Sequence, residues 1–257
     1  MTLLEARGIA KRFGGVNALD GVSLAIGKGQ IYGLIGPNGA GKTTFFNCLT
    51  GLYRHDAGRF WLDGVELDTR SPDRVVKSGI ARTFQNIRLF AGLSVLENVM
   101  VGRHARSGVG ALGAVLDTRA FRAEETAVRA RALELLGYVG LQARRDEPAR
   151  NLPYGDQRRL EIARALATDP RLLALDEPAA GMNATETAVL RTLLERIRAD
   201  GVTLLLIEHD VKLVMGLCDR VAVLDFGQLV IEGEPDTVRR DPAVIAAYLG
   251  ATVGDAP

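Results

Sequence analysis

The fold is decided by residues 36–44, which have the sequence Gly36-Pro37-Asn38-Gly39-Ala40-Gly41-Lys42-Thr43-Thr44. This stretch follows the apolar run 31–35 and precedes a helix-compatible segment at 45–49. The spacing GxxxxGK[ST] between a strand and a helix is typical of a phosphate-binding loop. Its glycines let successive backbone N–H groups point inward as an anion nest, and the start of the helix adds its positive end. We therefore predict that these nine residues bind the phosphates of a nucleoside triphosphate.

Two side chains of this loop have separate tasks in that prediction. Lys42 is expected to reach the β- and γ-phosphates, and the Thr43 hydroxyl is expected to hold Mg²⁺. The alternative is a glycine-rich turn with an incidental lysine. That alternative is disfavoured by the strand pattern before the loop and the helix pattern after it.

The composition is that of an ordinary globular protein and does not indicate a charged partner. The 257 residues are 47% hydrophobic and 25% charged, with a formal net charge of +1. Such a balance gives no argument for a nucleic-acid partner. Solvated helix faces are expected for Arg129, Arg131, Arg144, Arg145, Arg158 and Arg159. No stretch reaches 18 apolar residues, so we expect no membrane-spanning segment.

The patterning divides the chain into three regions. The first region predicts strands at 3–9, 22–26, 31–35 and 59–62. The second, residues 94–167, predicts helices at 124–136 and 157–166 and contains no convincing strand. The third predicts strands at 172–175, 202–207 and 221–224, with a helix after the capping pair Asn183 and Glu186. The chain is therefore expected to be an α/β protein with a helical subdomain inserted into its core.

Two carboxylates, Asp176 and Glu177, follow the buried strand expected at 172–175. In open α/β sheets, ligands sit at this end of the strands. Asp176 is expected to anchor Mg²⁺ through water, and Glu177 to act as general base for a hydrolytic water. The alternative is a solvated acidic turn. His209 follows the next buried strand at the corresponding end, so we assign it to the γ-phosphate, although a lone histidine is usually a surface or core residue.

A third segment, residues 151–166, lies between the loop and the acidic strand. It has the sequence Asn151-Leu152-Pro153-Tyr154-Gly155-Asp156-Gln157-Arg158-Arg159-Leu160-Glu161-Ile162-Ala163-Arg164-Ala165-Leu166. This segment resembles the signature segment of ABC transporter ATPases, and the similarity covers residues 3–250. The resemblance implies a P-loop NTPase fold with a mostly parallel core sheet, an antiparallel β subdomain and an inserted α-helical subdomain. It implies a single domain over 1–250, with a core at 1–93 and 168–250, helices at 94–167, and a tail at 251–257.

The resemblance also assigns further residues to ATP and Mg²⁺. It implies a head-to-tail dimer in which the phosphate-binding loop of one subunit and the signature residues Tyr154, Gly155 and Asp156 of the other clamp one ATP. Gln85 would meet Mg²⁺ or the attacking water and move with the helical insert. Phe13 matches the adenine-stacking aromatic residue, because stacking needs only a π-face. The alternative for Phe13 is a core residue at a strand end.

Residues 79–90, 176–183, 206–215 and 246–250 resemble the ATP-binding subunits of branched-chain amino acid importers. The insert at 101–122 is similar to that of the longer of their two ATPase subunits. The resemblance implies a peripheral position at the cytoplasmic face of the inner membrane. The implied partners are a second ATPase subunit, identical or paralogous, two transmembrane permeases and, indirectly, a periplasmic solute-binding protein.

Three other functions stay open at this point. Urea or amide importers and lipopolysaccharide exporters have similar cassettes, and a soluble ABC ATPase acting on ribosomes or DNA is a different class. The signature segment also departs from the common LSGGQ pattern. Pro153 replaces the serine and lacks an N–H group, and Tyr154 replaces the first glycine. We expect these departures to weaken the contribution of this segment to the partner's ATP.

Overall fold

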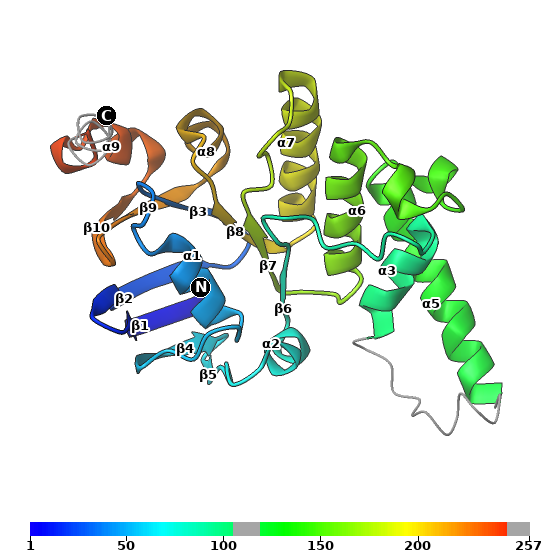
Figure 1. Cartoon of the computed structure of the whole chain (residues 1–257), viewed down its shortest axis with the longest axis horizontal. Helices are drawn as coiled ribbons and strands as arrows, with labels where there is room; N and C mark the ends of the chain where they lie inside the picture. Colours follow the sequence, from blue (N-terminus) through cyan, green and yellow to red (C-terminus); the bar gives the residue numbers. More distant parts are fainter. Residues whose placement is uncertain (105–118, 246–257) are drawn as a thin grey trace.

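The computed structural model describes residues 1–104 and 119–245, which form two β-sheets and the helices that cover them (Figure 1). The insert predicted at 101–122 lies mostly outside these residues, as do the segment 246–250 and the tail at 251–257. The strands are β1 (Thr2–Phe13), β2 (Val16–Gly27), β3 (Ile31–Ile35), β4 (Ala57–Leu62), β5 (Val65–Glu66), β6 (Ile80–Arg82), β7 (Leu172–Asp176), β8 (Thr203–Ile207), β9 (Arg220–Asp225) and β10 (Gln228–Gly233). The helices are α1 (Lys42–Leu49), α2 (Pro72–Ser78), α3 (Val95–Arg103), α5 (Arg119–Tyr138), α6 (Tyr154–Leu166), α7 (Ala184–Ala199), α8 (Val211–Leu217) and α9 (Pro235–Arg240).

The larger sheet has the strand order β10-β9-β3-β8-β7-β6, and only β10 runs antiparallel to its neighbour. Every residue of β3, β7 and β8 is buried. Continuous apolar runs suit strands that are covered on both faces, which is why the sequence pattern located all three. The smaller sheet, β2-β1-β4-β5, is antiparallel.

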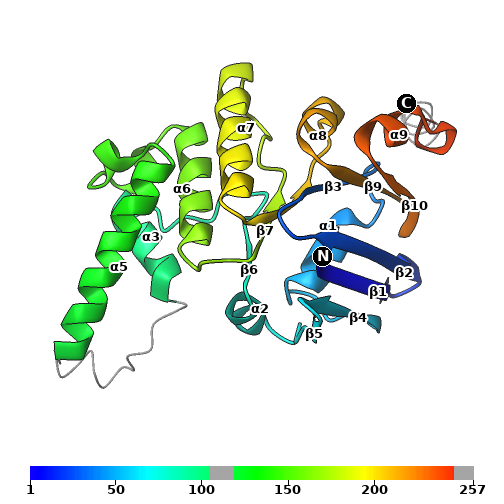
Figure 2. The same cartoon turned by 180° about the vertical axis from the view of Figure 1, so that it is seen from behind.

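The two faces of the larger sheet pack against two different apolar cores. One core contains Tyr32 and Leu34 of β3 and the phenylalanines Phe45 and Phe46 of α1, together with leucines of the smaller sheet. Helix α1 therefore lies between the two sheets (Figures 1 and 2). The other core joins the opposite face of β3, β7 and β8 to helices α3, α5, α6, α7 and α8. This arrangement confirms the predicted fold class.

The helices α3, α5 and α6 pack on one another beside the sheet. Helix α6 begins at Tyr154, three residues before the expected start, and Pro153 is its N-cap residue. Proline is compatible with this position because an N–H group there would have no partner within the helix. Helix α7 begins with the predicted capping box, since Asn183 accepts from the backbone N–H of Glu186 and the reverse bond is also present.

The register of the larger sheet brings three chain segments to one edge. Leu34 of β3 and Asp176 of β7 both pair with residues near the end of β8, because each is opposite Ile207. The phosphate-binding loop follows β3, Glu177 follows β7, and His209 follows β8. Parallel neighbouring strands therefore place the predicted loop, carboxylates and histidine side by side.

Candidate nucleotide-binding and hydrolytic site

The loop 36–44 follows β3 and runs into the first turn of α1, and it is the predicted anion nest. Gly36 and Gly41 have φ angles of 150° and 100°. A Cβ atom added to Gly36 would lie 2.1 Å from the carbonyl oxygen of Leu224, and one added to Gly41 would lie 2.5 Å from that of Ala18. Only glycine fits at these two positions, so the loop needs glycine for space as well as for conformation.

Lys42 projects from the first turn of α1 back into this loop. Its Nζ atom donates to the carbonyl oxygens of Gly36 at 2.7 Å and Pro37 at 2.9 Å. Burial lowers the pKa of Lys42 below its ordinary value, and the nearby carboxylates of Glu177 and Asp176 oppose that shift. The ammonium group therefore lies at the loop and within electrostatic reach of both predicted carboxylates.

Glu177 is the residue on which the predicted catalytic side chains converge. Its Oε2 atom accepts a hydrogen bond from Gln85 Nε2 at 2.8 Å, and His209 Nδ1 lies 3.3 Å from its Oε1. Its φ angle is 47°, in a region that non-glycine residues rarely occupy. Backbone strain of this kind clusters at functional sites, where the surrounding structure holds it. The structure thus brings Gln85, Glu177 and His209 together although they lie far apart in the sequence.

Asp176 is 3% exposed and lies at the end of β7. Burial raises the pKa of its carboxyl group, and the guanidinium of Arg82 opposes that shift. Its backbone N–H donates to the Thr83 hydroxyl. The Asp176 carboxylate, the Thr43 hydroxyl and the Gln85 amide are the oxygen donors that Mg²⁺ prefers, so the residues present fit a magnesium ion beside the phosphates.

Phe13 lies at the end of β1 and is 45% exposed, so the alternative of a core residue is wrong. Its ring makes an edge contact with Tyr53, with centroids 5.4 Å apart, and Lys11 Nζ lies 5.3 Å from its centroid. It pairs with Val16, the first residue of β2. Strand β2 also contains Ala18, whose carbonyl abuts Gly41, so Phe13 lies on the hairpin that borders the loop.

Tyr154, Gly155 and Asp156 form the first turn of α6 and lie away from the loop of their own chain. Figures 1 and 2 show α1 and α6 on opposite sides of β7. The backbone of Gly155 lies against Glu186 of α7 instead, because a Cβ atom at Gly155 would be 2.9 Å from Glu186 Oε1. One chain therefore holds the loop and the signature turn at separate places.

The prediction of a solvated helix face was wrong for Arg158. Its side chain is completely buried and paired with buried Glu161, at 3.0 Å between Nη1 and Oε2. Two further bonds run from its guanidinium to the backbone carbonyls of Phe84 and Gln85. Helical periodicity predicted an outward position, but the loop around Gln85 covers this side of α6. The other five arginines of that prediction are exposed or half-buried.

The sequence analysis also missed two residues that support the site. Arg82 donates to Asn47 Oδ1 at 2.9 Å and Thr50 Oγ1 at 2.8 Å, and it lies 3.4 Å from Asp176 Oδ2. Glu208 is 1% exposed and accepts from the backbone N–H of Ala179 and of His209. The available signal was a charged residue close in sequence to a predicted site residue, since Glu208 precedes His209 and Arg82 lies three positions before Gln85.

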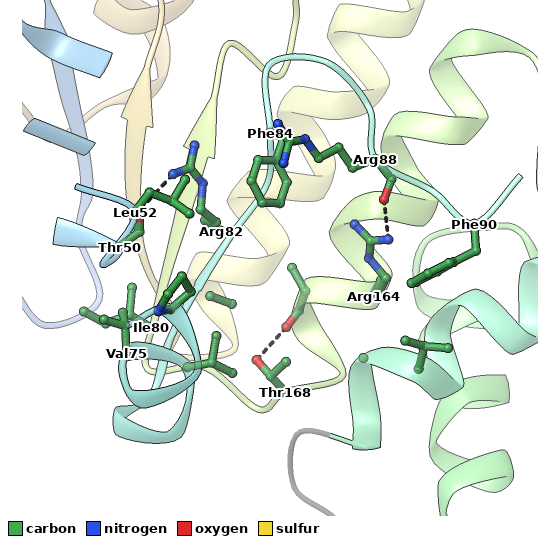
Figure 3. Close-up of a pocket in the computed structure, with 16 residues that line it drawn as sticks. Thr50, Leu52, Val75, Ile80, Arg82, Phe84, Arg88, Phe90, Arg164 and Thr168 are labelled. Atoms are coloured by element: carbon green, nitrogen blue, oxygen red, sulfur yellow. Dashed lines mark hydrogen bonds between the residues drawn. The ribbon is translucent and has the colours of Figure 1, made fainter. Parts of the chain in front are cut away.

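A cavity of about 400 Å³ opens beside the loop that contains Gln85 (Figure 3). It is lined by α2, β6, α3 and α6 as well as by that loop. The guanidinium groups of Arg82 and Arg88 both lie over the Phe84 ring, at 4.6 and 4.5 Å from its centroid. Figure 3 shows the three side chains beside one another. Arg164 of α6 donates to the carbonyl of Arg88.

Comparison with known proteins agrees with this geometry. A family model described as ABC transporter matches residues 19–180. The chain belongs to the ABC transporter family. A second model, described as branched-chain amino acid ATP-binding cassette transporter, matches residues 232–253 of this cassette.

Individual relatives match the cassette over almost its whole length. It is 45% identical to the high-affinity branched-chain amino acid transport ATP-binding protein LivG of Escherichia coli K12, over 96% of this chain and 98% of the relative. The ADP conformation of MJ1267, an ATP-binding cassette of an ABC transporter, superposes with a TM-score of 0.85 at 33% identity, covering 97% of this chain and 99% of that one. A dimeric post-hydrolysis state of the cassette MJ0796, bound to ADP and Pi, has a TM-score of 0.76 at 25% identity, with coverage of 91% and 99%. Within residues 1–104 and 119–245 the cassette has no helix that is both long and apolar enough to cross a membrane.

Proposed function

We propose that the chain is the ATP-hydrolysing subunit of an importer for branched-chain, hydrophobic amino acids. The observation that carries the proposal is the convergence of Gln85 and His209 on Glu177, next to the loop that contains Lys42. The family match and the 45% identity to LivG, a branched-chain amino acid transport protein by name, support the choice of solute.

In this proposal the loop residues 36–44 hold the triphosphate through their backbone N–H groups, and Lys42 contacts the β- and γ-phosphates. Phe13 stacks on the adenine. Glu177 accepts a proton from a water molecule whose oxygen bonds to the γ-phosphorus, while the bond from that phosphorus to the ADP oxygen breaks. The products are ADP and inorganic phosphate. His209 and Gln85 orient the water, and proton transfer of this kind contributes about 10²–10⁴ in rate.

Thr43, Asp176 and Gln85 would hold Mg²⁺, which when bound neutralises charge on the phosphates. Of these three residues, Asp176 has a buried carboxylate that lies near the guanidinium of Arg82. A buried carboxylate with only a 3.4 Å contact to a guanidinium retains lone pairs for a metal-bound water.

We also propose that the chain works as a head-to-tail dimer with a second ATPase subunit, identical or paralogous. The separation of the signature turn from the loop supports this, since Tyr154, Gly155 and Asp156 can then meet the partner's ATP. The dimer would lie at the cytoplasmic face of the inner membrane on two permease subunits, and act indirectly with a periplasmic solute-binding protein. Each subunit would be one domain over 1–250, with a core at 1–93 and 168–250 and a helical subdomain at 94–167.

The substitution Glu177→Gln tests the hydrolytic assignment. The variant should bind ATP and accumulate as a closed dimer, while its rate of phosphate release falls by a factor of about 10² or more. The measurements are phosphate release and gel filtration with ATP. Glu195→Gln is the matched control, because that glutamate is an exposed residue of α7 in a surface ion pair with Arg191. Undiminished turnover of the Glu177→Gln variant would remove Glu177 from the mechanism.

A further inference from the structure

The loop that contains Gln85 is fastened to helix α6 by two buried side chains. Arg158 Nη1 donates to the carbonyl of Phe84 at 2.7 Å, and Nη2 donates to the carbonyl of Gln85 at 2.9 Å. Glu161 Oε1 accepts from the backbone N–H groups of Phe84 at 3.2 Å and Arg88 at 3.4 Å. The backbone on both sides of the Gln85 side chain is therefore bound to one helix.

Fold stability alone gives a weak reason for this arrangement. The side chains of Arg158 and Glu161 are 0% and 1% exposed, and Arg158 Nε has no hydrogen-bond partner. A buried ion pair is often no more stabilising than apolar residues of similar volume, because both charges lose their hydration. Arg158 and Glu161 together make four hydrogen bonds to the backbone of this loop. Hydrogen bonds are directional, so they fix the position of the loop in a way that an apolar contact does not.

The loop carries the side chain that reaches the predicted general base. Gln85 Nε2 lies 2.8 Å from Glu177 Oε2, while the backbone carbonyl of Gln85 is bonded to Arg158 of α6. The guanidinium of Arg158 also donates to the hydroxyl of Tyr154, in the signature turn that begins α6. One buried group thus contacts both the signature turn and the backbone of Gln85.

We propose that Arg158 and Glu161 are positioning residues that make Gln85 follow helix α6, so that the position of the signature turn determines whether Gln85 reaches Glu177. The inference depends on the proposed hydrolytic function. In this inference, Arg158 and Glu161 couple the position of the signature turn, which meets the partner's ATP, to the contact between Gln85 and Glu177 in the same chain. No hydrogen bond or ion pair joins Arg158 or Glu161 to the loop 36–44, so nucleotide binding at the chain's own loop should not depend on them.

The test uses the full chain assembled with its transporter partners and compares Arg158→Met, Arg158→Lys and Glu161→Gln. Each variant should lower kcat for ATP hydrolysis by about ten- to a hundredfold, because a small misplacement of a catalytic group has that effect. KM and the equilibrium affinity for ATP should stay within about threefold. Arg158→Lys should not restore activity, since an ammonium group cannot donate to both carbonyls in a fixed fork.

Two further measurements separate positioning from general destabilisation. Gln85→Ala removes the group through which the pair acts, so adding Arg158→Met to it should cause no further loss of kcat. Amide hydrogen exchange at 84–88 should rise in Glu161→Gln, which keeps the shape of the side chain. Leu160→Ala, buried on the same helix within the apolar core, should lower Tm but leave kcat and exchange at 84–88 unchanged below the transition.

The proposal is overturned if kcat is unchanged in Arg158→Lys and Glu161→Gln, or if the losses in Arg158→Met and Gln85→Ala multiply in the double variant. If Arg158→Met does not fold, the kcat values of Arg158→Lys and Glu161→Gln test the proposal instead. Absence of ATP hydrolysis in the unmodified assembly would instead contradict the proposed function, so the two failures are distinguishable.

Discussion

At the scale of single residues, the site is defined by side chains held in unusual positions. Glu177 has a positive φ and is held between Gln85 and His209. Lys42 is 7% exposed, and its ammonium group is bonded to two carbonyls of its own loop. Such local strain and burial persist only where neighbouring structure stabilises them, and they prepare groups for one chemical task.

Replacing Lys42 with alanine should weaken ATP binding by about 10- to 100-fold, because a hydrogen bond to a charged group contributes about 1.5–3 kcal/mol. Isothermal titration with ATP measures the affinity. Lys28→Ala is the control, since Lys28 is half-exposed and pairs with Asp63 at the surface. Wild-type affinity in Lys42→Ala would contradict the assignment of this side chain to the phosphates.

At the scale of elements, the start of helix α6 differs from a helix with a capping side chain. Pro153 occupies the N-cap position, and no side chain there accepts a hydrogen bond from the first turn. Helix α7 shows what such a cap provides, because its Asn183 and Glu186 satisfy each other's backbone N–H groups. Pro153 has neither the backbone N–H nor the hydroxyl of a serine, so this turn offers fewer donors to a phosphate than one that begins with serine.

The substitution Pro153→Ser should therefore have two effects. A serine N-cap stabilises a helix by about 1 kcal/mol, which raises Tm by about 2–4 °C in a chain of this size. ATPase activity of the assembled transporter should also rise, because the hydroxyl can meet the partner's γ-phosphate. Thermal denaturation and phosphate release measure the two effects. Pro153→Ala is the control that removes the ring without adding a hydroxyl, and unchanged activity in the serine variant would count against a weakened signature.

At the scale of the whole molecule, the site is divided between two parts of the fold. The loop, Asp176, Glu177 and His209 follow neighbouring strands of one sheet, whereas the signature turn begins a helix on the other side of β7. In the proposed head-to-tail dimer, a nucleotide would contact the loop of one chain and the signature turn of the other. Such a dimer would link a local contact at the γ-phosphate to movement of rigid bodies.

Affinity purification from detergent-solubilised membranes should recover the chain with a second ATPase subunit and two permeases. This outcome is expected because the proposed importer moves its solute through separate permease subunits. Uptake of labelled leucine by cells that carry the unmodified chain with its transporter partners, compared with cells that carry the Glu177→Gln variant, tests the proposed solute. Recovery with ribosomal proteins or DNA would indicate the soluble class, and uptake of urea or amides would replace the proposed solute.

Much of the fold could be predicted from the sequence, because its signals are local. Continuous apolar runs located β3, β7 and β8, and parallel pairing then brought Asp176, Glu177 and His209 to the edge that holds the loop. The loop at 36–44 could be predicted from its glycines, because glycine readily adopts the positive φ angles that other residues rarely adopt. Gln85 was found only through resemblance, since nothing in its neighbouring sequence indicates a contact with Glu177.

The amino-acid sequence by itself determined the glycine-rich loop between β3 and α1, the buried strands and the order of the acidic and histidine residues, because each depends on neighbours in the chain. Only the tertiary structure decided the environment of Arg158. Its periodicity on α6 predicted solvent, but the carbonyl it contacts belongs to Phe84, 74 positions earlier. Burial of a charged side chain depends on which distant backbone groups pack over it, and no local pattern contains that information.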